Sequence, residues 1–201
     1  MWQTVEVTNY SPRKIFGSWT EGWVLDLHST GSTYVGDNEL GHPQFETHRT
    51  DIGELLFRLK YRSDRTVISE MTSVASEFIR SRDFGPDIVV PVPPTRARGF
   101  QPVIALAFEL ARRLGIPIAA EAVRKTKRFA ELKSVYDAEE RRRLLEGTFS
   151  LKIEKIRDRR ILLVDDLYRS GATMNAIAEA ITAGGATAIF AFAFTQTRSR
   201  A

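Results

Sequence analysis

From residue 88 onward, the chain alternates short apolar runs with segments of helical periodicity. The apolar runs lie at 88–92, 161–164 and 188–194, and such runs are typical of strands covered on both faces of a parallel sheet. Helices are predicted over 103–114, 138–145 and 173–182, and a further short strand over 116–119. Strands that alternate with helices predict an α/β fold with a doubly wound, mostly parallel sheet.

Two amphipathic helices are predicted before this region. The first is marked by apolar residues at i, i+3, i+4 and i+7 spacing, namely Ile52, Leu55, Leu56 and Leu59. The second runs over 66–80 with one apolar stripe, and Gly85 and Pro86 follow it.

The first fifty residues have a different pattern, with aromatic residues set among Gly, Thr, Ser and Asn. Short strands or hairpins are predicted there, divided by turn residues at 29–32 and 36–38. We therefore expect a small β-rich N-terminal appendage over 1–50 and an α/β domain over 51–201. His28, His42 and His48 also lie in this segment, and their scattered spacing favours ordinary histidines over a metal site.

Composition narrows the setting of the protein. The 201 residues include no cysteine, which excludes disulfides, thiolate zinc sites and a cysteine nucleophile. No apolar run approaches the ~18 residues of a membrane span, and the N-terminus lacks the basic and apolar regions of a secretory signal. These features favour a cytoplasmic protein.

Charge is unevenly distributed along the chain. Residues 1–60 carry a net charge of −3, and residues 61–201 carry +7. A basic C-terminal part suits an anionic ligand, either a phosphate ester or a nucleic acid.

The most informative segment follows the apolar run 161–164. Asp165 and Asp166 come at its carboxyl end, where open α/β sheets bind ligands. Adjacent carboxylates repel each other, so we expect a partner that offsets the repulsion. The vicinal hydroxyls of a ribose are suitable, and Mg²⁺ near both carboxylates would favour their charged forms, although no individual metal ligand is assigned.

The next residues are predicted to form a loop that enters a helix. Unpaired backbone N–H groups at a helix start attract anions, and a phosphate is therefore expected at Tyr168, Arg169, Ser170, Gly171, Ala172 and Thr173. The alternative is that the two acids are solvated loop residues and Thr173 is an ordinary N-cap. The combination of strand, acidic pair, Ser-Gly-x-Thr and helix favours a phosphorylated ribose.

The segment 161–173 resembles the ribose-phosphate signature of type I phosphoribosyltransferases. Four other segments, 59–62, 91–94, 98–101 and 140–149, resemble the ComF-type branch of that superfamily. The resemblance extends from Asp51 to the end of the chain. It departs from the usual pattern at Ser170, where threonine is common, and at Leu144, where asparagine is common.

This resemblance implies the type I phosphoribosyltransferase fold and a role for each matching residue. Asp165 and Asp166 would hold the ribose hydroxyls, and residues 168–173 the 5′-phosphate. The pyrophosphate loop would comprise Pro94, Thr95 and Arg96, with Arg96 neutralising the departing pyrophosphate. A flexible loop over 124–134 would close over the reacting groups.

Two classes of function follow from the resemblance. The first is an enzyme that binds phosphoribosyl pyrophosphate, or a nucleotide monophosphate, with Mg²⁺ and transfers the phosphoribosyl group to or from a nucleobase or amine. The second is a binding module, either a ComF-type competence protein acting in single-stranded DNA uptake or a non-catalytic regulator.

Three points are left open by the sequence. The basic residues near Phe129 could contact pyrophosphate or single-stranded DNA, or could form a solvated loop; they are Arg124, Lys125, Lys127, Arg128 and Lys133. A homodimer is possible, and the acceptor substrate is not identified.

Overall fold

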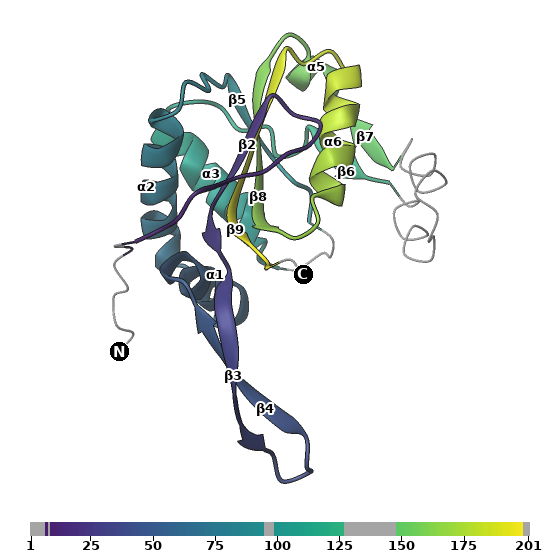
Figure 1. The fold of residues 1–201 in the computed structure, drawn as a ribbon. Coiled ribbons are helices and arrows are strands. Elements are labelled where there is room, and N and C mark those ends of the chain that lie inside the picture. Colours follow the sequence, from purple (N-terminus) through teal and green to yellow (C-terminus); the bar gives the residue numbers. More distant parts are fainter. Residues whose placement is uncertain (1–6, 8, 95–98, 127–147, 199–201) are drawn as a thin grey trace.

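A computed structural model describes residues 7, 9–94, 99–126 and 148–198. Its centre is a five-stranded sheet in the order β1-β2-β9-β8-β5 (Figure 1). Four neighbouring strands are parallel: β2 (Glu21–Leu27), β9 (Ala188–Gln196), β8 (Arg160–Tyr168) and β5 (Ile88–Pro91). Only β1 (Arg13–Lys14) is antiparallel to its neighbour. The predicted mostly parallel sheet is confirmed.

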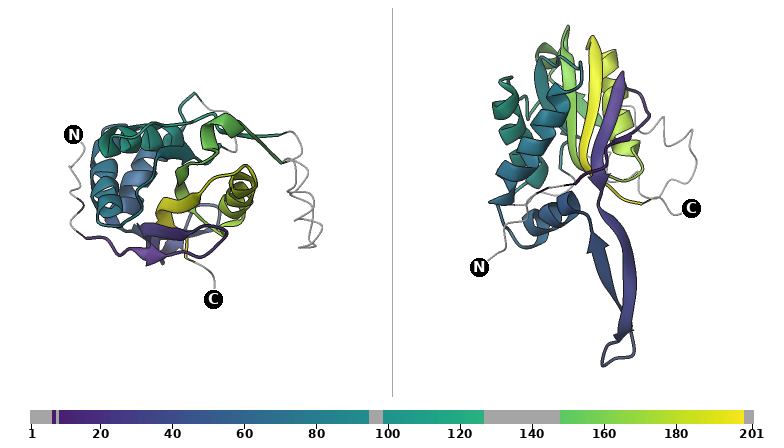
Figure 2. Two further views of the ribbon diagram at one scale, coloured as in Figure 1. Left: turned by 90° about the horizontal axis from the view of Figure 1, so that it is seen from above. Right: turned by 60° about the vertical axis from the view of Figure 1, so that its left-hand side comes forward.

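Helices cover both faces of this sheet (Figure 2). One face packs against α1 (Asp51–Tyr61), α2 (Val67–Arg80) and α3 (Pro102–Leu114), and the other against α6 (Ala172–Ala183) and the short α5 (Ile153–Ile156). Local signals set some of these ends, since Thr50 accepts a hydrogen bond from the N–H of Gly53 at the start of α1. Because helices cover both faces of a mostly parallel sheet, the predicted doubly wound architecture is confirmed.

The two faces of β9 show why the sheet separates two cores. Phe190, Phe192 and Phe194 belong to the core beneath α1, α2 and α3, whereas Ala191 and Ala193 belong to the core beneath α6. Alternation is the natural consequence of a strand, because successive side chains point to opposite faces. Large rings fill the side with three long helices, and small residues let α6 approach closely on the other side.

The N-terminal region differs from the expected appendage. Strand β2 pairs in parallel with β9, and its Val24 and Leu25 have no exposed surface. Only β3 (Ser29–Asp37) and β4 (Pro43–Arg49) form a separate two-stranded sheet. The boundary at residue 50 therefore does not separate the sheet from an appendage. The sequence suggested local hairpins here because parallel pairing with a strand far along the chain leaves no local signal.

Smaller differences lie beside β5. The strand expected over 116–119 is reduced to one bridge between Ile118 and Val89. A small antiparallel sheet is formed by β6 (Val123–Lys125) and β7 (Phe149–Leu151). The helix predicted over 138–145 and most of the loop predicted over 124–134 lie outside the described residues. None of the described helices is long and apolar enough to cross a membrane.

Truncation of β2 tests whether this strand is integral to the fold. Leu25→Ala removes a fully buried side chain, so we expect the free energy of unfolding to fall by about 2–5 kcal/mol in urea denaturation. Thr187→Ala, just before β9, serves as the control, because Thr187 is exposed and its truncation should change stability by less than ~0.5 kcal/mol. An unchanged transition for Leu25→Ala would mean that β2 is dispensable to the domain.

Candidate functional site

A cleft of about 800 Å³ opens at the carboxyl ends of β5 and β8. This is the edge at which open α/β sheets bind ligands. Nine of the residues predicted for the site line it: Pro94, Asp165, Asp166, Tyr168, Arg169, Ser170, Gly171, Ala172 and Thr173. The other two predicted residues, Thr95 and Arg96, lie outside the described residues. All the predicted site residues that the structure describes therefore line one cavity.

The acidic pair lies within a strand and not in a loop. β8 continues to Tyr168 and keeps its register with β9 as far as Gln196. Both acidic residues are only partly exposed, so the alternative that they are solvated loop residues is wrong. Strand geometry fixes the backbone of the pair firmly. The sequence could not indicate this, because charged residues after an apolar run usually mark the end of a strand.

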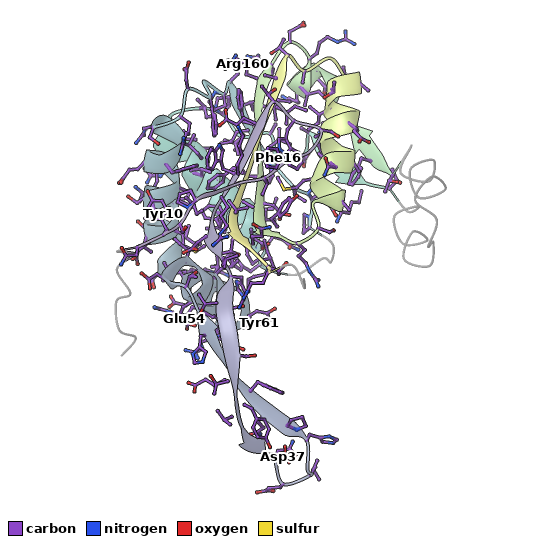
Figure 3. The ribbon with its side chains drawn as sticks, in the orientation of Figure 1. Tyr10, Phe16, Asp37, Glu54, Tyr61 and Arg160 are labelled. Atoms are coloured by element: carbon purple, nitrogen blue, oxygen red, sulfur yellow. The ribbon has the colours of Figure 1, made fainter. Side chains whose placement is uncertain are left out.

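Asp166 is neutralised by a lysine from a distant helix. The Nζ of Lys60 lies 2.9 Å from Oδ2 of Asp166, and the two side chains are 19% and 14% exposed. Lys60 belongs to the last turn of α1 and lines the cleft, as does its neighbour Tyr61. Figure 3 labels Tyr61 at the lower end of the body, close to where the hairpin begins. The sequence pattern assigns Lys60 no role, although this residue lies in the segment 59–62 that resembles the ComF-type branch.

The surroundings of Asp165 disfavour the charged form of its carboxyl group. Burial, and then the negative charge of Asp166, raise the pKa of Asp165 to about 7. The N–H of Asp166 donates to Oδ1 of Asp165 at 2.8 Å. This hydrogen bond and the charges of Lys60 and Lys125 lower the pKa of Asp165 by smaller amounts. Burial lowers the pKa of Lys125 in turn. A carboxyl group in this position favours a ligand that brings hydroxyl donors or a cation.

The donor set of the cleft fits Mg²⁺ in one specific way. Mg²⁺ usually binds one or two carboxylates and completes its octahedron with water and substrate phosphates. Asp165 and Asp166 offer such oxygens, and among the described residues no group of three or more His, Cys, Asp or Glu could hold a metal. The described residues therefore suit a cation that arrives with a ligand, not a metal caged by protein alone.

The other end of the cleft is the start of α6. Its N-cap is Gly171, at a φ of 74°, with no side-chain cap and no acidic residue in the first turn. The first helical bond runs from the N–H of Asn175 to the carbonyl of Gly171 at 2.8 Å, so the N–H groups of 172–174 lack helical partners. Such a terminus attracts an anion. Thr173 lies inside the helix, so its predicted alternative role as N-cap is wrong.

Gly171 is required at this position for two reasons. Its positive φ is strained for other residues, and a Cβ there would overlap the side chain of Tyr168. The Tyr168 ring packs edge-on against Trp19, with centroids 6.5 Å apart. Tyr168, which is predicted to bind phosphate, thus packs between Trp19 and Gly171 and supports the loop 168–171.

The N-terminal segment braces the phosphate end of the cleft. The N–H of Ser18 donates to Oδ1 of Asn175 at 2.7 Å, and Nδ2 of Asn175 donates to the carbonyl of Gly171 at 3.1 Å. These bonds connect the segment before β2 with the first turn of α6. No local pattern predicts this support, since Ser18 and Asn175 are 157 positions apart.

The Lys60–Asp166 pair can be tested by a double-mutant cycle. Lys60→Met leaves a half-buried carboxylate without its cation, and we expect it to lower the free energy of unfolding by roughly 1–3 kcal/mol. Adding Asp166→Asn should restore much of this loss. Lys155→Met, at an exposed lysine, is the control, and simple additivity of the two cycle mutations would contradict the pairing.

The raised pKa of Asp165 predicts a specific pH dependence. The ordinary value is 3.8 and the folded value about 7, so the folded chain binds more protons between these values and its stability falls as pH rises through that window. Asp165→Asn should therefore be more heat-stable than the parent at pH 8, with the difference vanishing near pH 4. Each pKa unit corresponds to about 1.4 kcal/mol, so even part of the shift is measurable. A difference in melting temperature that is independent of pH would contradict this assignment.

Comparison with known proteins gives matches of different strength. A family model described as "Phosphoribosyl transferase domain" matches residues 63–200. Competence protein F of Haemophilus influenzae is 29% identical over 136 residues, covering 62% of this chain and 59% of that protein. The chain therefore spans about three fifths of that relative's length.

Solved structures resemble the chain more remotely. Adenine phosphoribosyl transferase from Trypanosoma brucei is 11% identical, with a TM-score of 0.49 over 94% of this chain and 86% of that one. Glutamine phosphoribosylpyrophosphate amidotransferase from B. subtilis is 17% identical, with a TM-score of 0.48 over 85% of this chain and 36% of that one. The family match covers well over half of the chain and includes the acidic pair and the start of α6. The chain belongs to the phosphoribosyl transferase domain family.

Proposed function

We propose that this protein binds phosphoribosyl pyrophosphate together with Mg²⁺ in the cleft and transfers the phosphoribosyl group to or from a nucleobase or amine. The observation that carries the proposal is the placement of an acidic pair and an uncapped helix start in one cavity. A sugar diol needs acceptors and a phosphate needs donors, and the cleft offers both. Its volume of about 800 Å³ also lies in the range of small-ligand sites.

Each end of the cleft would have its own task. Asp165 and Asp166 would accept hydrogen bonds from the two ribose hydroxyls, and the backbone N–H groups at the start of α6 would bind the 5′-phosphate. Mg²⁺, held by ligand oxygens beside the acidic pair, would neutralise negative charge on the pyrophosphate. Both ends are fixed by β8 and α6, so the sugar would be held in one orientation.

The transfer breaks the bond between C1 of the ribose and the pyrophosphate oxygen, which leaves with the electron pair. The lone pair of an acceptor nitrogen forms the new bond to C1, and the proton that this nitrogen carried passes to water or to the departing pyrophosphate. Basic groups that stabilise the departing charge would lower the barrier. Lys60 and Lys125 line the described cleft, and Arg96 is proposed for the same task from the pyrophosphate loop.

A second function is favoured by the match to competence protein F. In that case the cleft would bind a nucleic-acid phosphate, or sense a phosphoribosyl ligand without catalysis. Binding of single-stranded DNA should weaken steeply with salt, because it releases counterions. Binding of phosphoribosyl pyrophosphate should instead depend on Mg²⁺ and need no DNA.

Calorimetric titration with phosphoribosyl pyrophosphate and Mg²⁺ tests the proposal. We expect Asp165→Asn/Asp166→Asn to weaken binding at least ~100-fold, since two charge-assisted contacts are lost. Gly171→Ala should weaken it comparably, because the new Cβ overlaps Tyr168 and displaces the phosphate end. The matched control is Glu77→Gln/Glu154→Gln, which neutralises two exposed carboxylates that do not line the cleft.

The outcomes separate the alternatives. Absence of binding at millimolar ligand, or full binding by the double Asn variant, would refute the proposal. Binding without pyrophosphate release across a panel of purines, pyrimidines and amines would leave a phosphoribosyl-ligand module in place of an enzyme.

A further inference from the structure

The hairpin of β3 and β4 projects far beyond the body of the protein (Figures 1 and 2). We call residues 29–48 the arm. Its strands pair only with each other, and nearly all of its side chains are exposed. A two-stranded hairpin alone is at best marginally stable in water, so we expect an arm of this length to be stabilised by contact with a partner.

Large apolar side chains are concentrated on the arm. Tyr34, Val35 and Phe45 are 53%, 55% and 58% exposed, and Leu40 at the tip is 80% exposed. Tyr34 and Phe45 are cross-strand partners whose ring centroids lie 5.8 Å apart. Tyr34 also donates to Asp37 at 2.7 Å. An ordered aromatic pair, with further exposed apolar side chains on the same projecting element, is typical of an interaction surface.

Charge restricts the partner of the arm. Residues 29–48 contain Asp37, Glu39 and Glu46 and no Lys or Arg, which gives −3, whereas the rest of the chain carries +7. Arg49, the last residue of β4, lies at the base of the arm. An acidic arm would be repelled by nucleic acid and by a second acidic arm. It is complementary to the basic body of another copy of this chain.

The body offers an apolar groove of suitable character between α2 and α3. The groove has a volume of about 570 Å³ and is lined mainly by Ile68, Phe100, Ile104 and Phe108. Phe108 is 60% exposed, and the guanidinium of Arg65 lies 4.4 Å from the ring centroid of Phe100. Arg65 is exposed and lies over the half-buried ring of Phe100, so the groove offers a cation and apolar surface to an arm that carries acids beside rings. Glu109 also lines the groove, and its carboxylate is paired with Arg112 and Arg113.

The groove also borders the candidate site. Gln101 lines both the groove and the cleft. The arm points away from the body to which it belongs, so this groove is open to the arm of a second molecule. An arm bound there would form one wall beside the partner's cleft.

We propose that two copies of the chain exchange arms, each arm docking in the α2–α3 groove of the other copy. Such an exchange is isologous and closes with two-fold symmetry. A stable interface needs roughly 20–30 residues a side, and an arm of 20 residues together with a groove meets that size. The inference does not depend on phosphoribosyl pyrophosphate binding.

The absence of cysteine allows a direct test by cross-linking. Leu40→Cys and Phe108→Cys variants, each carrying one thiol, are mixed and treated with a short bis-maleimide. We expect the mixed pair to give at least ten-fold more covalent dimer than either variant alone, because arm tips meet grooves and not other tips. The control pair combines Leu40→Cys with Thr182→Cys, an exposed position on α6.

Sedimentation equilibrium provides the second measurement. The parent chain of 22.7 kDa should sediment as a dimer at tens of micromolar, and Leu40→Lys/Phe45→Lys should be a folded monomer by circular dichroism. A monomeric parent at 100 μM, a dimer that survives the double Lys variant, or equal cross-linking to Thr182→Cys would overturn the proposal. A monomer that binds a different protein through the arm would overturn it as well.

Discussion

The structure depends on placing two adjacent carboxylates at the end of a buried strand. An unpaired charge in such a position is unfavourable, and the two carboxylates differ in how this is relieved. Asp166 is paired with Lys60, whereas the pKa of Asp165 is raised to about 7 by burial and by Asp166. The asymmetry leaves one group neutralised by the protein and one that an incoming ligand or cation can stabilise.

This constraint explains why the N-terminal third cannot be separated from the site. α1 must lie across the carboxyl edge of the sheet for Lys60 to reach Asp166. The segment before β2 must in turn reach Asn175 and Tyr168 to hold the start of α6. Residues before position 63, which the family model does not match, therefore hold Asp166 and the start of α6, which it does match.

The sequence predicted the parts of the fold that local periodicity encodes. Apolar runs located β5, β8 and β9, helical spacing located α1, α2, α3 and α6, and one short signature located the cleft. It did not predict β2 as a strand of the sheet, because its partner Phe190 lies 169 positions beyond Glu21. Nor did it predict the pairing of Lys60 with Asp166, which only the packing of α1 creates. Tertiary contacts of this kind leave no periodic trace.

The cleft contains features that stability alone would not favour. A neutral side chain at Asp165 would avoid the burial of a carboxyl group, and a serine at an ordinary N-cap would satisfy N–H groups that Gly171 leaves open. Both departures face the same cavity. Because one leaves acceptors and the other leaves donors, a single ligand carrying hydroxyls and a phosphate would satisfy both at once. Two independent defects of folding would have no reason to be complementary in this way.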